Sequence, residues 1–186
     1  MKSFLIPIKL TLILIIICAG LFPVIVALIG KLAPGGGKGE TISVNGKVVG
    51  YAHVGQKFTD DKYFWGRPSA VDYNAAGSAG SNKGPSNPDY LKTVQDRIDT
   101  FLIHNPGIQK SAIPAEMVTA SGSGLDPDIS PASAYVQVKR IAAVRGLPED
   151  KVQSLVAGHV EKPLLGMLGP SKVNVLKLNV ALDVLR

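Results

Sequence analysis

The sequence has almost none of the chemistry that cysteine provides. Its single cysteine, Cys18, lies inside an apolar run from Leu10 to Ile29. The rest of the chain can therefore form no intramolecular disulfide, offers no thiol nucleophile and cannot build a cysteine metal site. A domain that follows the run must be stabilised by side-chain packing alone.

Charge is also absent from Leu10–Ile29, where fourteen of the twenty residues are Leu, Ile, Val or Phe. Twenty helical residues span about 30 Å, the thickness of the hydrocarbon core of a bilayer. Three alternatives fit this run less well. A cleaved signal has a shorter apolar core, and a lipoprotein signal has a small residue where this chain has Ile17. A buried helix of a soluble protein normally has a polar face, which this run lacks. We therefore predict a retained transmembrane helix, in which Pro23 removes one backbone hydrogen bond and kinks the last turns.

The charges that flank this run do little to set its orientation. Lys2 and Lys9 precede it, and Lys31 and Lys38 follow it, so the positive-inside rule is nearly balanced. A short tail before the helix and a long domain after it favour a cytoplasmic N-terminus. The sequence thus predicts a cytoplasmic tail at 1–9, a transmembrane helix at 10–30, a linker at 31–39 and an extracytoplasmic domain at 40–186.

The chain is basic, with a formal net charge of +6. A basic balance can indicate nucleic acid or a membrane surface as a partner. The Lys and Arg residues are scattered, however, and form no cluster interleaved with aromatic residues. We therefore expect the lipid bilayer as a partner and no binding of nucleic acid.

The domain after the linker has the local signals of an α+β fold. Asn45-Gly46 between two β-branched runs predicts a hairpin with a type I′ turn over roughly residues 40–54. Asn87 and Ser130, each followed by proline, predict the N-caps of two helices. A third helix is predicted to begin at Pro148.

The C-terminal segment Leu176–Val184 alternates apolar residues with mostly polar ones. A period of two indicates a strand, and a helix is the alternative. The predicted fold class is therefore α+β: a single N-terminal transmembrane helix, then one soluble domain with a β-hairpin, about three helices and a C-terminal strand.

No motif in the sequence predicts an enzyme. Gly37-Lys38 is followed by glycine, not by the Ser or Thr of a phosphate-binding P-loop. Ser121–Gly124 lacks the spacing of a nucleophile elbow. Asp126–Ser130 begins like a calcium loop, but Pro131 stands in the place of its required glycine. We predict no catalytic residue, no metal and no cofactor by motif, with an anchored hydrolase or a solute-binding domain as alternatives.

Three segments rich in Gly, Ser and Pro adjoin the predicted helices, at residues 63–74, 80–88 and 119–131. Loops on rigid helices often carry binding sites, so we expect the three to converge on one partner-binding surface. Trp and Arg are also enriched in interface hot spots. The alternative is that Trp65 packs in the core and Arg67 makes a local structural bond. The candidate residues are Tyr63, Phe64, Trp65, Arg67, Asn82, Ser86, Asn87, Ser121, Ser123 and Asp126.

These segments also carry a family resemblance. Residues 63–70 (YFWGRPSA), 80–88 (GSNKGPSNP), 119–131 (TASGSGLDPDISP), 137–140 (QVKR) and 173–182 (VNVLKLNVAL) are similar to motifs of the KdpC family. That family is the small subunit of the bacterial Kdp potassium-transporting ATPase. The resemblance runs from the apolar helix to the C-terminus.

The resemblance implies a complex in the bacterial inner membrane. Its other members would be a channel-like subunit that selects potassium, a P-type ATPase subunit and a small single-span peptide. This chain lacks the D-K-T-G phosphorylation motif, so ATP hydrolysis is expected of its partner and the chain itself is expected to be a non-catalytic accessory subunit. The family is described as a catalytic chaperone that raises the affinity of the ATPase subunit for ATP, which implies ATP at the level of the complex. Assembly and stabilisation of the complex from outside is the simpler role.

Overall fold

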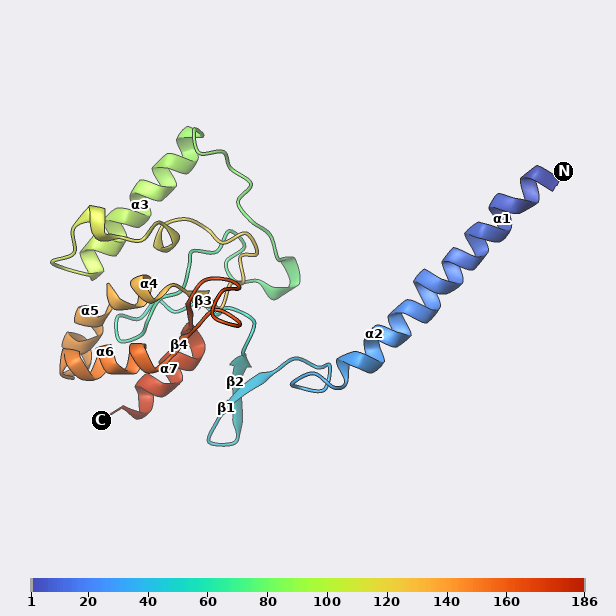
Figure 1. The fold of residues 1–186 in the computed structure, drawn as a ribbon. Helices are drawn as coiled ribbons and strands as arrows, with labels where there is room; N and C mark the ends of the chain where they lie inside the picture. Colours follow the sequence, from blue (N-terminus) through green and yellow to red (C-terminus); the bar gives the residue numbers. More distant parts are fainter. Residues whose placement is uncertain (1, 186) are drawn as a thin grey trace. The chain divides into compact units, whose positions relative to one another are not determined.

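A computed structural model describes residues 2–185 of the chain (Figure 1). The chain divides into two compact units, of which the first ends at Thr41 and the second begins at Ile42. Each unit is described by itself.

The first unit is one long apolar helix followed by turns. Its parts are α1 (Lys2–Ile15), a π-helical turn η1 (Ile16–Leu21) and α2 (Phe22–Gly30). The stretch Phe4–Gly30 is long and apolar enough to cross a membrane, which confirms the predicted N-terminal helix and includes Leu10 and Ile29.

Proline explains the wide turn in this helix. Pro23 has no N–H to donate, and its ring collides with the carbonyl four residues earlier in a regular α-helix. The preceding residue, Phe22, donates its N–H to the Ile17 carbonyl five residues back. The π-helical spacing makes room for the proline ring while the helix continues.

The second unit opens with the predicted hairpin, formed by β1 (Thr41–Val44) and β2 (Lys47–Tyr51). Asn45 and Gly46 both have positive φ, at 50° and 78°, as a type I′ turn requires. A second, antiparallel sheet has the order β3 (Asp128–Ile129), β5 (Lys172–Asn174), β4 (Val160–Glu161). In this sheet Val173 pairs with Ile129 on one side and with Val160 on the other.

The helices of this unit begin where the sequence places their caps. The Asn87 side chain accepts a hydrogen bond from the Tyr90 N–H (3.0 Å), and the Ser130 hydroxyl accepts one from the Ser133 N–H (3.2 Å). Gly146 has a φ of 64° and ends a helix in the left-handed conformation. The helices are α3 (Pro88–His104), α4 (Pro131–Tyr135), α5 (Val138–Arg145), α6 (Glu149–Gly158) and α7 (Val175–Val184), with short 3-10 turns at Ala75–Gly77, Lys110–Ala112 and Ala115–Met117.

The predicted strand over Leu176–Val184 is wrong, because this segment forms α7. The Asn174 side chain caps the helix by accepting the Lys177 N–H (3.0 Å). Asn179 is buried, whereas the alternating pattern predicts that it is exposed. The C-terminal strand of the α+β fold is β5, which lies immediately before the helix.

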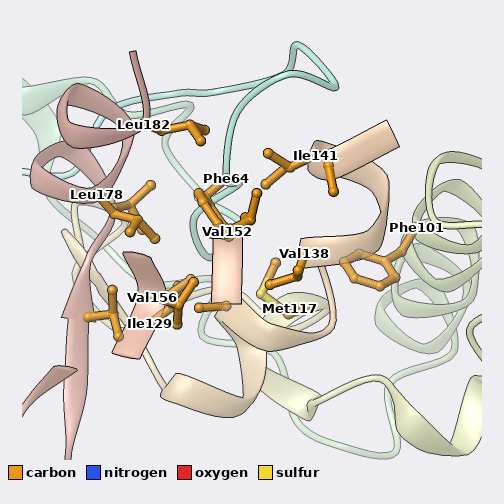
Figure 2. Close-up of a cluster of buried hydrophobic side chains, with 14 residues drawn as sticks. Phe64, Phe101, Met117, Ile129, Val138, Ile141, Val152, Val156, Leu178 and Leu182 are labelled. Carbon is orange, nitrogen blue, oxygen red and sulfur yellow. The ribbon is translucent and has the colours of Figure 1, made fainter. Parts of the chain in front are cut away.

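One hydrophobic core joins the helices and the three-stranded sheet of the second unit. Figure 2 shows Phe64 in this core together with Ile141 of α5, Val152 of α6, and Leu178 and Leu182 of α7. Phe64 is fully buried although it belongs to a long irregular segment. The core therefore includes part of the first of the three predicted loops.

Candidate functional site

The segment Tyr63–Arg67, which we name the aromatic segment, is held by two buried side-chain amides. Asn179 accepts the Phe64 N–H (2.8 Å) and donates to the Phe64 carbonyl (3.0 Å). Gln137 accepts the Trp65 N–H (2.8 Å) and donates to the Trp65 carbonyl (3.1 Å). Each amide thus replaces a neighbouring strand and satisfies both backbone groups of one residue.

The three aromatic side chains of this segment have different environments. Tyr63 donates its hydroxyl proton to the Asp183 carboxylate (3.1 Å), and the Arg145 guanidinium lies over its ring at 5.0 Å. Trp65 is partly buried and packs edge-on against His104, with 4.9 Å between ring centroids. The fully buried Phe64 cannot present its side chain to a partner, so its assignment as a contact residue is corrected to a packing role.

Arg140 connects the aromatic segment to the helices. Its guanidinium is buried, lies 4.6 Å from the Trp65 ring and donates to the Tyr63 carbonyl (3.0 Å). It also donates to the side chains of Asn105 (3.0 Å) and Gln137 (2.7 Å) and to the backbone carbonyl of Asp61. Burial lowers the pKa of Arg140 to about 10, although the nearby aspartates oppose that shift, so the group remains charged at neutral pH.

The first and third predicted loops meet at a set of residues that we name the loop junction: Arg67, Ser69, Ser121, Gly124 and Asp126. Arg67 forms an ion pair with Asp126 (3.1 Å). Ser69 donates its hydroxyl proton to the Gly124 carbonyl (2.7 Å). The Ser121 hydroxyl accepts the Gly124 N–H (2.9 Å), so it closes the third loop internally. Ser121 is only 3% exposed, so its side chain has a structural role. Its prediction as a contact residue is corrected accordingly.

Gly124 is the position where the junction requires glycine. Its φ is 68°, and a Cβ there would lie 2.6 Å from Val71 Cγ2 and 2.8 Å from the Ala79 carbonyl oxygen. Both contacts are closer than real Cβ atoms approach other atoms. Two chain segments therefore pack directly against the backbone of the third loop.

The second predicted loop approaches the third loop only where it begins, at Gly80 and the preceding Ser78. Ser78 donates its hydroxyl proton to the Ser123 carbonyl (2.9 Å), and the backbone at Gly80 lies close to Gly122. Asn82 and Ser86 are exposed, whereas Asn87 caps α3. Within residues 2–185, the side chains of these three residues have no hydrogen bond to the loop junction. The structure thus brings the first and third loops together and leaves most of the second apart.

A cleft of about 450 Å³ lies beside the junction, between the aromatic segment and α3. Trp65, Phe101 and Tyr73 contribute aromatic surface, and Arg67 and Arg97 contribute positive charge. The Arg67 Nε atom is buried and has no hydrogen-bond partner among the described residues. Lys57, Asp72 and Asp96 also line the cleft, so charges of both signs lie beside the aromatic surface. The cleft is therefore suited to apolar groups that also carry polar atoms.

The hydroxyl of Tyr73, which lines this cleft, stays protonated near neutral pH. Burial, with a contribution from Asp126, raises the pKa of Tyr73 to about 12, and its hydroxyl donates to the Arg67 carbonyl. A phenol with that pKa is a donor and not a base at physiological pH. Among residues 2–185, no group of three or more His, Cys, Asp or Glu side chains could hold a metal ion.

Sequence reasoning missed the residues that hold the site. Gln137, Arg140 and Asn179 are all buried and polar. Gln137 is the N-cap of α5, Arg140 lies in α5 and Asn179 lies in α7, and the other buried residues of both helices are apolar. A polar residue on an apolar helical face must find a partner, and that was the signal available in the sequence. The segments 137–140 and 173–182 contain all three.

The fold defines a class of protein: a domain linked to a helix of membrane-spanning length. A family model described as "KdpC: K+-transporting ATPase, c chain" matches residues 4–184. The "Potassium-transporting ATPase KdpC subunit" of Flavobacterium johnsoniae is 61% identical, with all of both chains covered. The protein of the same name from Flavobacterium psychrophilum is 60% identical over the same coverage, and that from Caldanaerobacter subterraneus is 49% identical over 94% of this chain and 91% of its own. The chain belongs to the KdpC family, as the resemblance of its motifs predicted, and is therefore a subunit of a K+-transporting ATPase complex.

Proposed function

We propose that this chain is a non-catalytic accessory subunit, which assembles with the channel-like and P-type ATPase subunits of the complex and stabilises them. Its full-length similarity to KdpC subunits carries this proposal. The helix Phe4–Gly30 supports a membrane location. The loop junction, fixed by hydrogen bonds from two segments far apart in sequence, supports a surface that recognises a partner in one fixed conformation.

The proposed orientation has the N-terminus in the cytoplasm and the domain outside the inner membrane. Protease added to intact spheroplasts tests this orientation. We expect digestion of the domain that follows residue 39 without disruption of the membrane. Survival of the domain until the membrane is broken would show that the orientation is reversed.

The proposed contact face comprises the loop junction and the adjoining cleft, with separate contacts from exposed residues of the second loop, most of which lies apart from the junction. Arg67 is its central residue, because it lines the cleft and pairs with Asp126. Both side chains remain partly accessible, at 25% and 29% exposed. Ser123, Asn82 and Ser86 are exposed and complete the face. Tyr63, Trp65 and Asn87 make the structural contacts described above, and their contact with a partner stays a prediction.

Exchange of the Arg67–Asp126 ion pair separates a structural role from a contact role. Arg67→Asp alone should lower both the melting temperature of the chain and its recovery of the large subunits from mild detergent. The double variant Arg67→Asp/Asp126→Arg restores opposite charges across the pair. We expect it to recover most of the melting temperature but not the binding of the large subunits, because the partner would then meet reversed charges. Recovery of both properties would refute the contact role.

Any influence on ATP affinity is proposed to act through the other subunits. In the proposed orientation the domain faces away from the cytoplasm, where ATP is present. A stabilised partner conformation is then the route by which this chain raises ATP affinity. The ATP dissociation constant of the purified complex, measured with and without this chain, tests that role, and equal values would contradict it.

A further inference from the structure

An exposed apolar turn between β4 and β5 has no role in the site described above. Four large side chains form this apolar tip: Leu164, Leu165, Met167 and Leu168, which are 68%, 79%, 79% and 56% exposed. The turn is closed by hydrogen bonds from the Leu164 N–H to the Leu168 carbonyl (3.0 Å) and from the Leu168 N–H to the Leu164 carbonyl (2.9 Å). The tip is therefore an ordered structure that presents apolar surface to its surroundings.

One leucine of the tip, Leu165, has a backbone conformation that is unfavourable for its residue type. Leu165 has a φ of 56°, a left-handed conformation that favours Gly or Asn. Its side chain is almost fully exposed, so packing within the domain does not compensate for that conformation. Together with the three neighbouring exposed side chains it forms an apolar patch, and such patches mark sites of contact with protein or membrane.

The charged residues near the tip indicate which kind of apolar surroundings it fits. Lys162 and Lys172 flank it, and the residues between them include no Asp or Glu. Lys172 also pairs with Asp128 (2.7 Å) and Glu161 (3.6 Å), whereas Lys162 is exposed. An apolar tip with an adjacent cation matches the layered chemistry of an anionic bilayer surface, where hydrocarbon lies beneath negative headgroups.

We propose that the apolar tip inserts into the headgroup region of the bilayer, where Lys162 binds anionic phospholipid headgroups. The chain carries a helix long enough to span that bilayer. Residues 31–41 connect this helix to the second unit and extend to about 36–40 Å at most. A tether of that length keeps the lipid surface at a high effective concentration, so a small insertion is enough to hold the tip there. The contact restricts how the domain turns on its linker.

Depth-dependent fluorescence quenching in the full chain tests this proposal. The variant Cys18→Ser/Met167→Cys is labelled with an environment-sensitive fluorophore and reconstituted in vesicles of phosphatidylcholine and phosphatidylglycerol. Some of the lipids carry a spin label at a defined depth. Cys18→Ser/Ile103→Cys is the matched control, because Ile103 is also an apolar residue and is 77% exposed on α3. The fluorescence of Trp65 confirms that both variants are folded.

We expect lipids with a shallow spin label to quench the fluorophore at 167 several-fold more strongly than the one at 103. Addition of Lys162→Gln, or omission of phosphatidylglycerol, should reduce that quenching. Equal quenching at the two positions would overturn the proposal. So would a fluorophore at 167 that is insensitive to spin-labelled lipid and becomes shielded only when the large subunits are present, because the tip would then bind protein.

Discussion

Replacement of Gln137 by methionine tests how the aromatic segment is held. Methionine nearly preserves the volume and length of the side chain but removes its amide. Gln137 is fully buried. Its amide exchanges two hydrogen bonds with the Trp65 backbone, donates to the Ser133 carbonyl (2.9 Å) and accepts from Arg140 (2.7 Å). The variant loses all of these interactions without opening a large cavity.

The expected loss of stability follows from the groups left behind. Both the N–H and the carbonyl of Trp65 lose their amide partner, and each unpaired buried group costs about 1–3 kcal/mol. Arg140 also loses one acceptor while it remains charged and buried. We therefore expect Gln137→Met to lower the free energy of unfolding by about 3–6 kcal/mol. For a domain of this size the melting temperature falls by roughly 2–5 °C for each kcal/mol.

Thermal melting of the full chain in detergent, followed by circular dichroism and by Trp65 fluorescence, measures this loss. Gln153→Met is the matched control, since Gln153 is an exposed residue of α6. The control should change the free energy of unfolding by no more than about 0.5 kcal/mol. Equal melting temperatures for the two variants would refute the view that Gln137 holds the segment.

Three further variants test other parts of the structure by the same melting assay. Arg140→Met should cost about 3–5 kcal/mol, because it leaves the Tyr63 carbonyl and the side-chain oxygens of Asn105 and Gln137 without their donor. Lys139→Met, on the exposed side of α5, should cost almost nothing, and similar values for both variants would contradict the buried network. Gly124→Ala should cost about 1–3 kcal/mol through its left-handed backbone and more through its clashes, whereas Gly122→Ala, which meets nothing within 4 Å, should be tolerated. Burial raises the pKa of Glu116, but hydrogen bonds from Ser133 and Ser130 outweigh it, so the net shift is downward from 4.5. A carboxyl whose pKa is lower in the folded state stabilises the fold at pH values above its unfolded-state pKa. The difference in melting temperature between the wild type and Glu116→Gln should therefore be full at pH 7 and disappear as the pH falls from 4.5 through the lower folded-state pKa. A difference that does not depend on pH would exclude this charge effect.

Local signals allowed much of the fold to be predicted. Asn45-Gly46, Asn87 and Ser130 act on backbone groups within a few residues, so their consequences can be derived from the sequence. Asn179 shows where such reasoning fails. Its partner is the backbone of Phe64, 115 residues away, and the sequence alone does not show that this partner exists. Without knowledge of this partner, the pattern places the polar residue on an exposed face and predicts a strand where the structure has the helix α7.

The candidate site was predicted in part for the same reason. The contact between residues 63–74 and 119–131 was expected from the position of both segments beside helices, and the loop junction contains it. The inward orientation of Phe64 depends on the amide of Asn179 and on the helices around it. The sequence therefore indicated that these two segments meet but not which of their side chains face outward. Contact of the remaining residues with partner subunits stays a prediction.

Purification of the tagged full chain from its native membranes in mild detergent tests the central claim most directly. Mass spectrometry of the purified material identifies the proteins that remain bound. We predict that a P-type ATPase subunit and a polytopic channel-like subunit are recovered with the chain in comparable amounts. Recovery of the chain alone, under detergent conditions in which it remains folded, would contradict its assignment as an assembling subunit of the potassium-transporting complex.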